Sequence, residues 1–454
     1  MTVFFTKEAI DWLILILEER FGHSFYIMQS NQGLKLSLKN KPERYILFPN
    51  LNKMFHQSSS DMPCSYWDAT KEGWDSVIGE PIPAPAVAEL RQPLIEYNNN
   101  DCFTVHYDIL GLTYWMLNRI EEIGRTDLDE HQRFPATSSH ACKYGYIERP
   151  IVDEWLNILG QVITGLWSQL KLKKHQFSIK VSHDVDAPSR YGFKSPSKLL
   201  RSMLADIIKR KDFKGATLAP IVRMNNRYQL SKLDPFNTFN WLMDLSEANN
   251  LQSSFYFICG RTDPLMDADY ELEHPSIRNL LQLIHKRGHE IGLHPSYNSF
   301  KSPNIIKREA DRLRTVMDQE NINQPDIGGR MHVLRWTHPL TLQAWNDASL
   351  SYDSTLGYAD MPGFRCGTCF EYPAFNPMTQ KILDVRIRPL IAMECSVIDK
   401  RYLGLGYTQG SLDKFMQLKD TCKRIKGCFT LLWHNSHFQY DGDKYIYKRL
   451  IKNT

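Results

Sequence analysis

From Phe177 onward, the chain alternates between apolar runs of strand length and segments whose apolar residues recur at helical spacing. The strand-like runs cover residues 177–186, 253–259, 289–294, 327–336, 350–357, 382–393 and 428–434. Helices are predicted ahead of several runs, at 237–250, 276–287 and 339–347. Strands that alternate with helices predict an α/β fold with a parallel sheet. Seven such units favour a distorted seven-stranded (β/α) barrel, open or incomplete relative to the eight-stranded form.

The residues before this region lack such a rhythm. Short strands, turns and helices are mixed over residues 1–150. A helix with Pro150 at its first position follows, and its apolar residues between Val152 and Leu170 lie on one face. The polar stretch 171–176 then leads into the first strand of the α/β region. We therefore expect a smaller α+β N-terminal domain over residues 1–172 and the barrel over residues 173–454.

The composition is that of a soluble globular protein, with 42% hydrophobic and 23% charged residues. The net charge of +4 is small for 454 residues and predicts no nucleic-acid partner. No apolar run reaches the ~20 residues that a membrane span needs. The run Trp12–Leu17 is flanked by Asp11 and Glu18, so it predicts a buried helix rather than a signal peptide. We expect a cytoplasmic protein.

The nine cysteines are scattered and odd in number, which does not suggest a disulfide framework. Cys366 and Cys369 form one Cys-x-x-Cys pair, but no second pair stands at the spacing of a zinc finger. The cysteines therefore fit an intracellular compartment and predict no cysteine-based metal site.

The first strand of the α/β region ends in two carboxylates, Asp184 and Asp186. Residues two apart on a strand project from the same face. Two adjacent carboxylates repel each other unless a cation binds beside them or the two groups take different roles. The pair therefore suggests one metal ligand and one base. The alternative is a strand-to-loop turn in which aspartate is only a turn former.

Polar residues also end several other predicted strands, where catalytic groups lie in barrels of this kind. They are His294 with Ser296 and Asn298, then Arg330, His332 and Arg335, then Asp353, and finally His434 and His437. Buried polar groups without partners cost a few kcal/mol each, so such a concentration is hard to explain as core. The pattern predicts a functional site at this edge of the sheet.

Four of these segments occur in the same order as the motifs of a known family. They are Ser182–Asp186, Gly288–Pro295, Gly329–Trp336 and Leu431–His434. Together they resemble the polysaccharide deacetylase family (carbohydrate esterase family 4, NodB-homology fold) over the C-terminal 60% or so of the chain. The Asp-x-Asp form of the first motif also resembles a bacterial branch linked to surface-polysaccharide synthesis, whose members carry an extra N-terminal domain.

The resemblance implies a role for each matching residue. Asp184 corresponds to the base and Arg330 to the arginine that braces it. Asp186 and His294 correspond to metal ligands, and His434 corresponds to the general acid. The implied cofactor is one divalent ion, with zinc expected and cobalt, nickel or manganese as substitutes. The implied reaction removes an acyl group, N-acetyl in the first place, from an amino sugar of a glycan or glycan precursor.

The chain departs from the family pattern at Asn298, where the family has a second histidine four residues after the first. Three interpretations are open: Asn298 is a ligand, His183 or His332 completes the site, or the site holds no metal. Asn298 is the ligand expected from its position in the motif. The third motif also lacks the family's Arg-x-Pro-Tyr pattern, which leaves the oxyanion donors open. The acid that orients His434 is open between Asp353 and Asp360.

Two other functions remain open at this level. A barrel without metal would be a non-catalytic glycan-binding or assembly protein. A hydrolase with a different pocket would act on a small amide that is not a sugar. The segment Arg190–Lys214 carries eight Lys or Arg against two Asp. It is either a solvated amphipathic helix or a dock for an acidic glycan, a sugar nucleotide or a lipid phosphate.

Overall fold

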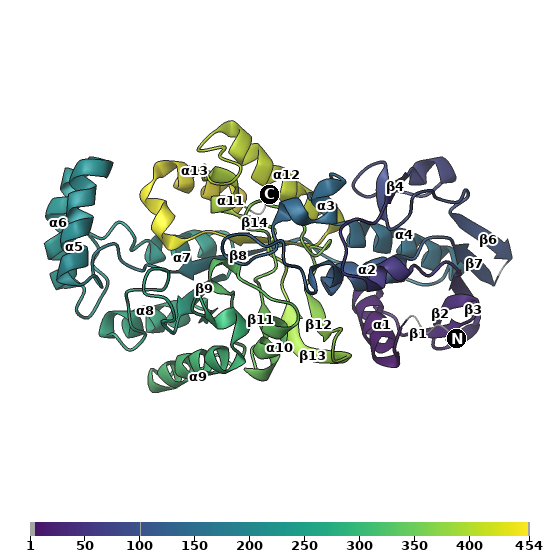
Figure 1. Cartoon of the computed structure of the whole chain (residues 1–454), viewed down its shortest axis with the longest axis horizontal. Coiled ribbons are helices and arrows are strands. Elements are labelled where there is room, and N and C mark those ends of the chain that lie inside the picture. The colour runs from purple at the N-terminus through teal and green to yellow at the C-terminus, as the bar shows by residue number, and fades with distance from the viewer. Residues whose placement is uncertain (1–4, 100, 453–454) are drawn as a thin grey trace. The chain divides into compact units, whose positions relative to one another are not determined.

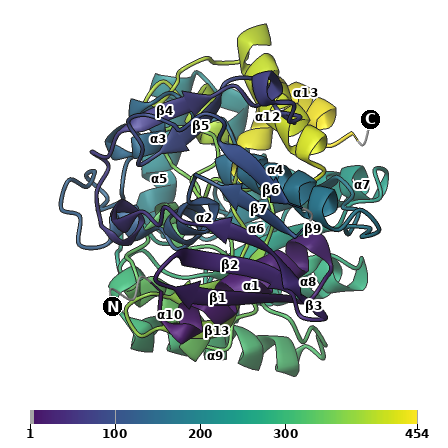
Figure 2. The same cartoon turned by 90° about the vertical axis from the view of Figure 1, so that its right-hand side faces the viewer.

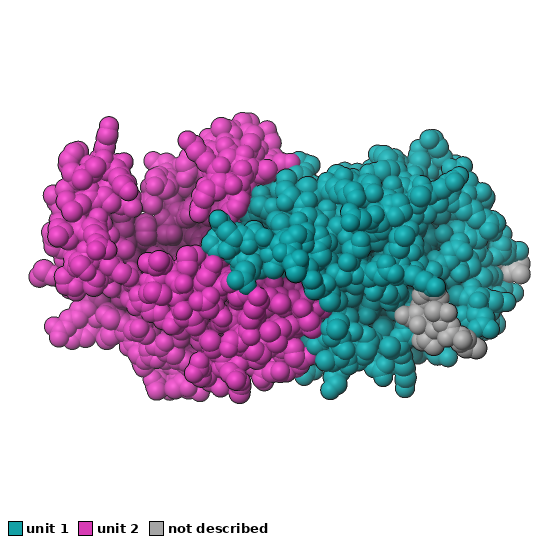
Figure 3. Space-filling view, viewed as in Figure 1, with its two compact units in different colours: residues 1–178, 356–391, 417–429 teal, residues 179–355, 392–416, 430–454 magenta. Residues whose placement is uncertain are grey.

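The computed structural model describes residues 5–99 and 101–452, and the chain groups into two compact units. Unit 1 comprises residues 1–178, 356–391 and 417–429, and unit 2 comprises residues 179–355, 392–416 and 430–454 (Figure 3). The first passage from unit 1 to unit 2 falls at residue 178, and two later segments return to unit 1. The domain division at residue 172 stays a prediction.

Helix α1 (Lys7–Phe21) carries the apolar run of the N-terminus. Thr6 Oγ1 caps the helix by accepting a hydrogen bond from Ala9 N at 3.1 Å. Gly22 ends it in the left-handed region at φ 76°, where a residue with a side chain would be strained. Trp12 is fully buried, and its indole N–H donates to Pro373 O at 2.8 Å. The run is a buried helix, as the sequence predicts.

Unit 1 contains a mixed sheet in the order β1-β2-β3-β7-β6 (Figure 2). Its strands are β1 (Phe25–Ser30), β2 (Gly33–Leu38), β3 (Lys41–Phe48), β7 (Cys102–Val105) and β6 (Ile95–Asn99). The β3–β7 pair is parallel, and the other pairs are antiparallel. Helix α4 (Ile151–Leu166) contacts β3 and β7, and it is preceded by α2 (Ile109–Leu117) and α3 (His140–Lys143). The N-terminal part is therefore a separate α+β arrangement.

Two antiparallel hairpins complete unit 1, namely β4 (Cys64–Trp67) with β5 (Ile82–Pro85) and β12 (Tyr372–Asn376) with β13 (Lys381–Ile387). Buried ion pairs join the returning segment to the N-terminal residues. Glu122 accepts from Arg365 at 2.6 and 2.9 Å and from Arg119 at 2.8 Å. Burial opposes ionisation of this glutamate, but the two guanidinium groups lower its pKa to about 2. Within unit 1, ion pairs as well as packing thus join residues 356–391 to the N-terminal residues.

Unit 2 is built on a parallel sheet in the order β10-β9-β8-β15-β14, of which β8, β9 and β14 are labelled in Figure 1. These strands are β8 (Ser178–Val185), β9 (Ser253–Ile258), β10 (Glu290–His294), β14 (Ala392–Met393) and β15 (Cys428–Leu432). The sheet continues as a row of parallel strands beyond β10 to β11 (Tyr352–Asp353). Two parallel bridges make this connection, one from Leu293 to Gly329 and one from Gly329 to Asp353. The protein is therefore an α/β protein with a parallel sheet, as the alternating pattern predicts.

Helices connect these strands along the chain. They are α5 (Pro196–Ala205), α6 (Phe213–Asn225), α7 (Phe239–Glu247), α8 (Pro275–Lys286), α9 (Pro303–Gln319), α10 (Leu340–Asp347), α11 (Glu394–Ile398), α12 (Gln409–Ile425) and α13 (Asp441–Leu450). Helices α7, α8 and α10 occupy the predicted helical segments. In the part of the chain that is described, no helix is long and apolar enough to cross a membrane.

Three predicted strands differ from the structure, and the run 350–357 forms only the two-residue β11. The run 382–393 divides into antiparallel β13 and the two-residue β14, because Pro389 lacks the N–H group that a continuous ladder requires. The run 327–336 contributes only the bridges at Gly329. An ideal Cβ at Gly329 would lie 1.9 Å from Leu293 O, so only glycine permits this approach. The chain then leaves the sheet through Val333, whose φ is 59°.

Candidate functional site

The carboxyl ends of the parallel strands in unit 2 bring polar side chains together. Asp184 and Asp186 come from the end of β8, and His294 is the last residue of β10. The Nε2 atom of His294 lies 3.7 Å from Asp184 Oδ2 and 3.2 Å from Asp186 Oδ1. The two carboxylates therefore lie on the same side of β8, as their spacing of two residues predicts.

Arg330 binds the Asp184 carboxylate on the side away from His294. Its Nη1 donates to Asp184 Oδ1 at 2.8 Å, and the guanidinium is fully buried. The remaining donors are also used, since Nη2 donates to Ser182 Oγ at 2.9 Å and Nε donates to Ser354 O at 2.9 Å. A guanidinium fixed on three sides holds the carboxylate in one orientation. Asp184 Oδ2 is the oxygen left to face the site.

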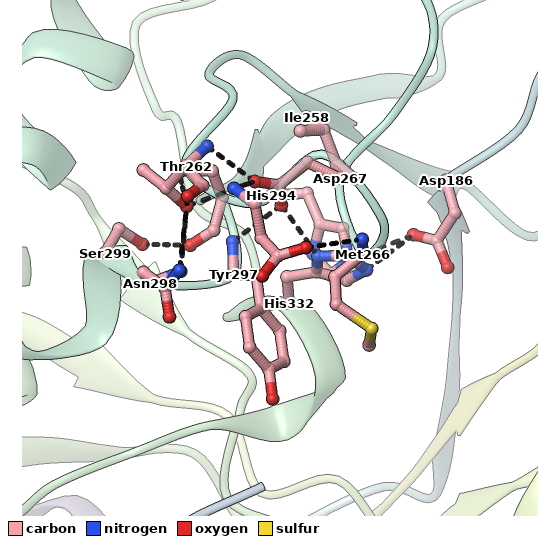
Figure 4. A network of polar contacts seen from close by, with 12 residues as sticks. Asp186, Ile258, Thr262, Met266, Asp267, His294, Tyr297, Asn298, Ser299 and His332 are labelled. Carbon is pink, nitrogen blue, oxygen red and sulfur yellow. Dashed lines mark hydrogen bonds and ion pairs between the residues drawn. The ribbon is translucent and has the colours of Figure 1, made fainter.

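Asp186 and two histidines form the candidate metal group (Figure 4). Ligand atoms of Asp186, His294 and His332 lie within 4.8 Å of one another. His332 Nε2 is 3.8 Å from Asp186 Oδ1, and both histidines are almost fully buried. One carboxylate oxygen and two imidazole nitrogens form a donor set that suits zinc and leaves positions for other ligands.

Each histidine of the group is oriented through its other ring nitrogen. His294 Nδ1 lies 2.6 Å from Arg330 O, and His332 Nδ1 lies 3.3 Å from Asp267 Oδ1. The carbonyl oxygen can only accept, so Nδ1 of His294 donates to it and Nε2 faces the site. Hydrogen bonds of this kind orient metal-binding histidines in proteins.

Asp186 provides a direct test of whether these residues fit a metal ion. Its Oδ1 atom is buried and forms no hydrogen bond, although two imidazole nitrogens lie within 3.8 Å. Burial opposes ionisation of this carboxyl, but His332, His294 and His434 hold its pKa well below the usual range. A charged carboxylate oxygen without a hydrogen bond, facing two Nε2 atoms, fits a divalent cation.

The structure does not bring Asn298 into this group. Its amide donates from Nδ2 to Thr262 O at 3.2 Å, and its Oδ1 accepts from Arg335 Nη1 at 3.1 Å. The side chain is exposed and lies apart from Asp186 in Figure 4. Both polar ends of Asn298 are thus engaged with the neighbouring loop, whereas His332 faces the carboxylate.

His434 lies on the other side of Asp186, with its Nε2 3.6 Å from Asp186 Oδ2. Its Nδ1 forms a very short contact with Glu394 Oε1, and its backbone N donates to the same oxygen at 3.2 Å. Burial opposes protonation of His434, but the Glu394 carboxylate raises its pKa well above the ordinary value. Burial likewise opposes ionisation of Glu394, yet His434 lowers its pKa to about 2. The Glu394 carboxylate therefore favours the protonated form of His434, whose Nε2 is directed at Asp186.

Cys395 and His437 flank this ion pair. Ligand atoms of Glu394, Cys395, His434 and His437 also lie within 4.8 Å of one another. Cys395 Sγ is 3.8 Å from His437 Nε2. Burial raises the pKa of the Cys395 thiol to about 11, so the thiol is not a ready nucleophile at neutral pH.

Other polar residues from the sequence analysis lie outside the site. His183 is buried, with Nδ1 2.7 Å from Trp433 O. His289, which precedes β10, accepts a hydrogen bond from Ser253 N at 3.0 Å. Asp353 Oδ1 accepts from Thr355 N at 2.8 Å, and Asp360 accepts from Ala136 N within unit 1. Neither aspartate contacts His434, whose partner is Glu394.

Sequence reasoning missed Glu394 and Asp267. Glu394 directly follows β14. It therefore obeys the strand-end rule, which places catalytic groups at the carboxyl ends of strands and identified the other residues. Asp267 lies in the loop after β9, where Tyr297 N donates to its Oδ1 at 2.7 Å and Thr262 N donates to its Oδ2 at 2.7 Å. No spacing in the sequence indicates that this loop returns to His332.

Comparison with known proteins gives a family match for the N-terminal part. Residues 6–168 match a family model described as a family of unknown function (DUF7033). This is less than half of the chain, and it leaves the residues of the candidate site uncovered. No curated protein matches the chain.

Two solved structures show distant similarity. One is a Mycobacterium smegmatis protein provisionally named a polysaccharide deacetylase, at 16% identity and a TM-score of 0.39, covering 62% of this chain and 84% of that one. The other is Puue allantoinase, at 12% identity and a TM-score of 0.35, covering 61% of this chain and 83% of that one. Both TM-scores are below 0.5, so neither likeness establishes an activity.

Proposed function

We propose that this protein is a metal-dependent hydrolase that removes an acyl group, N-acetyl in the first place, from an amino sugar of a glycan or glycan precursor. The observation that carries the proposal is the group of Asp186, His294 and His332 between Asp184 with its arginine and His434 with its glutamate. A base, a cation site and an acid in one place form one arrangement that can hydrolyse an unactivated amide.

The resemblance of the sequence motifs to the polysaccharide deacetylase family supports the same proposal. The parallel row that begins at β14 and ends at β11 is in keeping with an open seven-stranded barrel. Within it, we assign the metal to Asp186, His294 and His332, with zinc as the expected ion and cobalt, nickel or manganese as substitutes. When bound, such an ion would polarise the acyl oxygen and lower the pKa of water.

The residues of the chain perform the proton transfers. Asp184 takes a proton from the attacking water while Arg330 holds the carboxylate in place. The water oxygen bonds to the acyl carbon. His434 then gives its proton to the leaving nitrogen as the carbon–nitrogen bond breaks, and Glu394 holds the imidazole during this step. The products are a carboxylate and a free amine.

The alternative of a non-catalytic glycan-binding protein rests on a metal site that lacks a ligand. His332 supplies a third donor, so the departure at Asn298 no longer motivates that alternative. The small-amide alternative concerns the substrate alone, and the same acid and base would serve it.

Acetate release separates these functions. Purified protein supplied with zinc is expected to release acetate from N-acetylated amino sugars and their oligomers, and not from simple aliphatic amides. A chelator is expected to abolish the release, and added zinc to restore it. Release from simple amides alone would favour the small-amide hydrolase. No release from any substrate by zinc-loaded protein would favour the binding protein.

A further inference from the structure

The helical hairpin between β8 and α7 exposes an unusual amount of apolar surface. Eight of the 22 exposed large apolar side chains of the described residues lie between residues 200 and 228. They are Leu200, Leu204, Ile207, Ile208, Phe213, Ile221, Met224 and Tyr228. A segment of 29 residues thus holds more than a third of them, which marks it as a contact surface rather than chance exposure.

These side chains are not the packing core of the hairpin. A separate buried cluster of Tyr191, Leu199, Ala219 and Val222 fills the space between α5 and α6. On α5, Leu200 and Leu204 are four residues apart and share a face, and the exposed Ile207 and Ile208 follow in the π-helical turn Asp206–Arg210. On α6, Phe213 and Met224 are eleven residues apart and also share a face. Each helix therefore has an inner apolar face that is buried and an outer apolar face that is exposed.

Ion pairs hold the turn between α5 and α6, and the hairpin carries an excess of basic residues. The buried Asp206 carboxylate pairs with Arg190, and Tyr191 OH donates to its Oδ2 at 2.8 Å. Asp212 Oδ2 lies 3.1 Å from Arg190 Nη1. Residues 194–227 contain nine Lys or Arg and only these two acids. Lys209, Lys211 and Lys214 are exposed beside the outer apolar faces.

We propose that the hairpin of residues 196–228 docks onto a lipid bilayer that contains anionic lipids. Aliphatic and aromatic side chains flanked by lysines are the composition of helices that lie in the membrane interface. Anionic headgroups attract the lysines while the apolar side chains enter the acyl boundary. A second copy of this chain is a poorer partner, because two such cationic surfaces repel each other.

Vesicle co-sedimentation of the full chain tests this proposal without any measure of hydrolysis. The probes are vesicles of phosphatidylcholine alone and vesicles that also contain phosphatidylglycerol. Wild-type protein is expected to bind the second kind, and high salt is expected to weaken the binding. The triple variant I208S/F213S/M224S is expected to lose it, since these side chains are 71%, 64% and 79% exposed.

A charge variant and a matched control complete the experiment. Each lysine removed in K209Q/K214Q is expected to weaken binding about fivefold. Leu265→Ser removes a 91% exposed apolar side chain outside the hairpin and is expected to bind like wild type. Equal thermal melting of all variants establishes that each is folded.

Three results would overturn the proposal. They are wild-type protein that binds neither kind of vesicle, a triple variant that binds as wild type does, and self-association that the triple variant abolishes without any vesicle binding. The last would assign the surface to a second copy of the chain. None of them bears on the proposed hydrolase activity.

Discussion

Asp184→Asn is expected to lower kcat for acyl hydrolysis by about 10²–10⁴, the usual contribution of a positioned base. Asparagine can still accept the hydrogen bond from Arg330 Nη1, so the substitution retains the contact that holds this position. It cannot take a proton from water. The loss should therefore appear in kcat rather than in folding or in metal content, which is measured on the same sample.

Asp353→Asn is the matched control for this experiment. Asp353 is also a buried aspartate at the end of a parallel strand. Its carboxylate accepts a hydrogen bond from Thr355 N instead of facing the metal group. We expect a far smaller loss of kcat from it. A folded, metal-containing Asp184→Asn protein that hydrolyses substrate at the wild-type rate would exclude Asp184 as the base.

His434→Ala is expected to lower kcat on an N-acetyl amino sugar by about 10²–10⁴, because the leaving amine then lacks a proton donor. The loss should depend on the leaving group. A nitrophenyl acetate releases a phenolate that needs no proton, so hydrolysis of this ester should change little in the same variant. The comparison of kcat on the two substrates isolates the proton transfer from any general damage to the site.

Glu394→Gln is the companion variant, because the neutral amide no longer raises the pKa of His434. We expect it to reproduce part of the loss on the amide and to spare the ester. Equal losses on amide and ester in His434→Ala would contradict the role of acid and indicate instead that His434 maintains the metal group or the binding of substrate.

The strands that the sequence predicts well are those that are buried on both faces. All residues of β9 and β15 are buried, and such strands appear as continuous apolar runs bounded by polar turns. Strand β14 has only two residues, and the row is continued at Gly329 by single bridges. Stretches that short show no hydrophobic periodicity in the sequence, so only their tertiary contacts define them as strands.

The residues of the site also differ in how well the sequence predicts them. Asp184, Asp186, His294 and His434 stand at or just beyond the ends of strands that are visible in the sequence, so the strand-end rule finds them. The choice between Asn298 and His332 depends on how the chain leaves the sheet. The left-handed turn at Val333 follows His332 in a segment that the pattern represents as a continuing strand. That turn cannot be inferred from hydrophobic spacing.

The metal content of the purified chain tests the central claim most directly. Elemental mass spectrometry after dialysis would compare wild type with His294→Ala, His332→Ala and Asn298→Ala. We predict about one zinc, cobalt, nickel or manganese ion per chain in wild type and in Asn298→Ala, and loss of the ion in both histidine variants. Metal that is retained in His332→Ala and lost in Asn298→Ala would contradict the assignment of the ligands. No metal in any sample, even after incubation with each ion, would contradict the metal-dependent hydrolase itself.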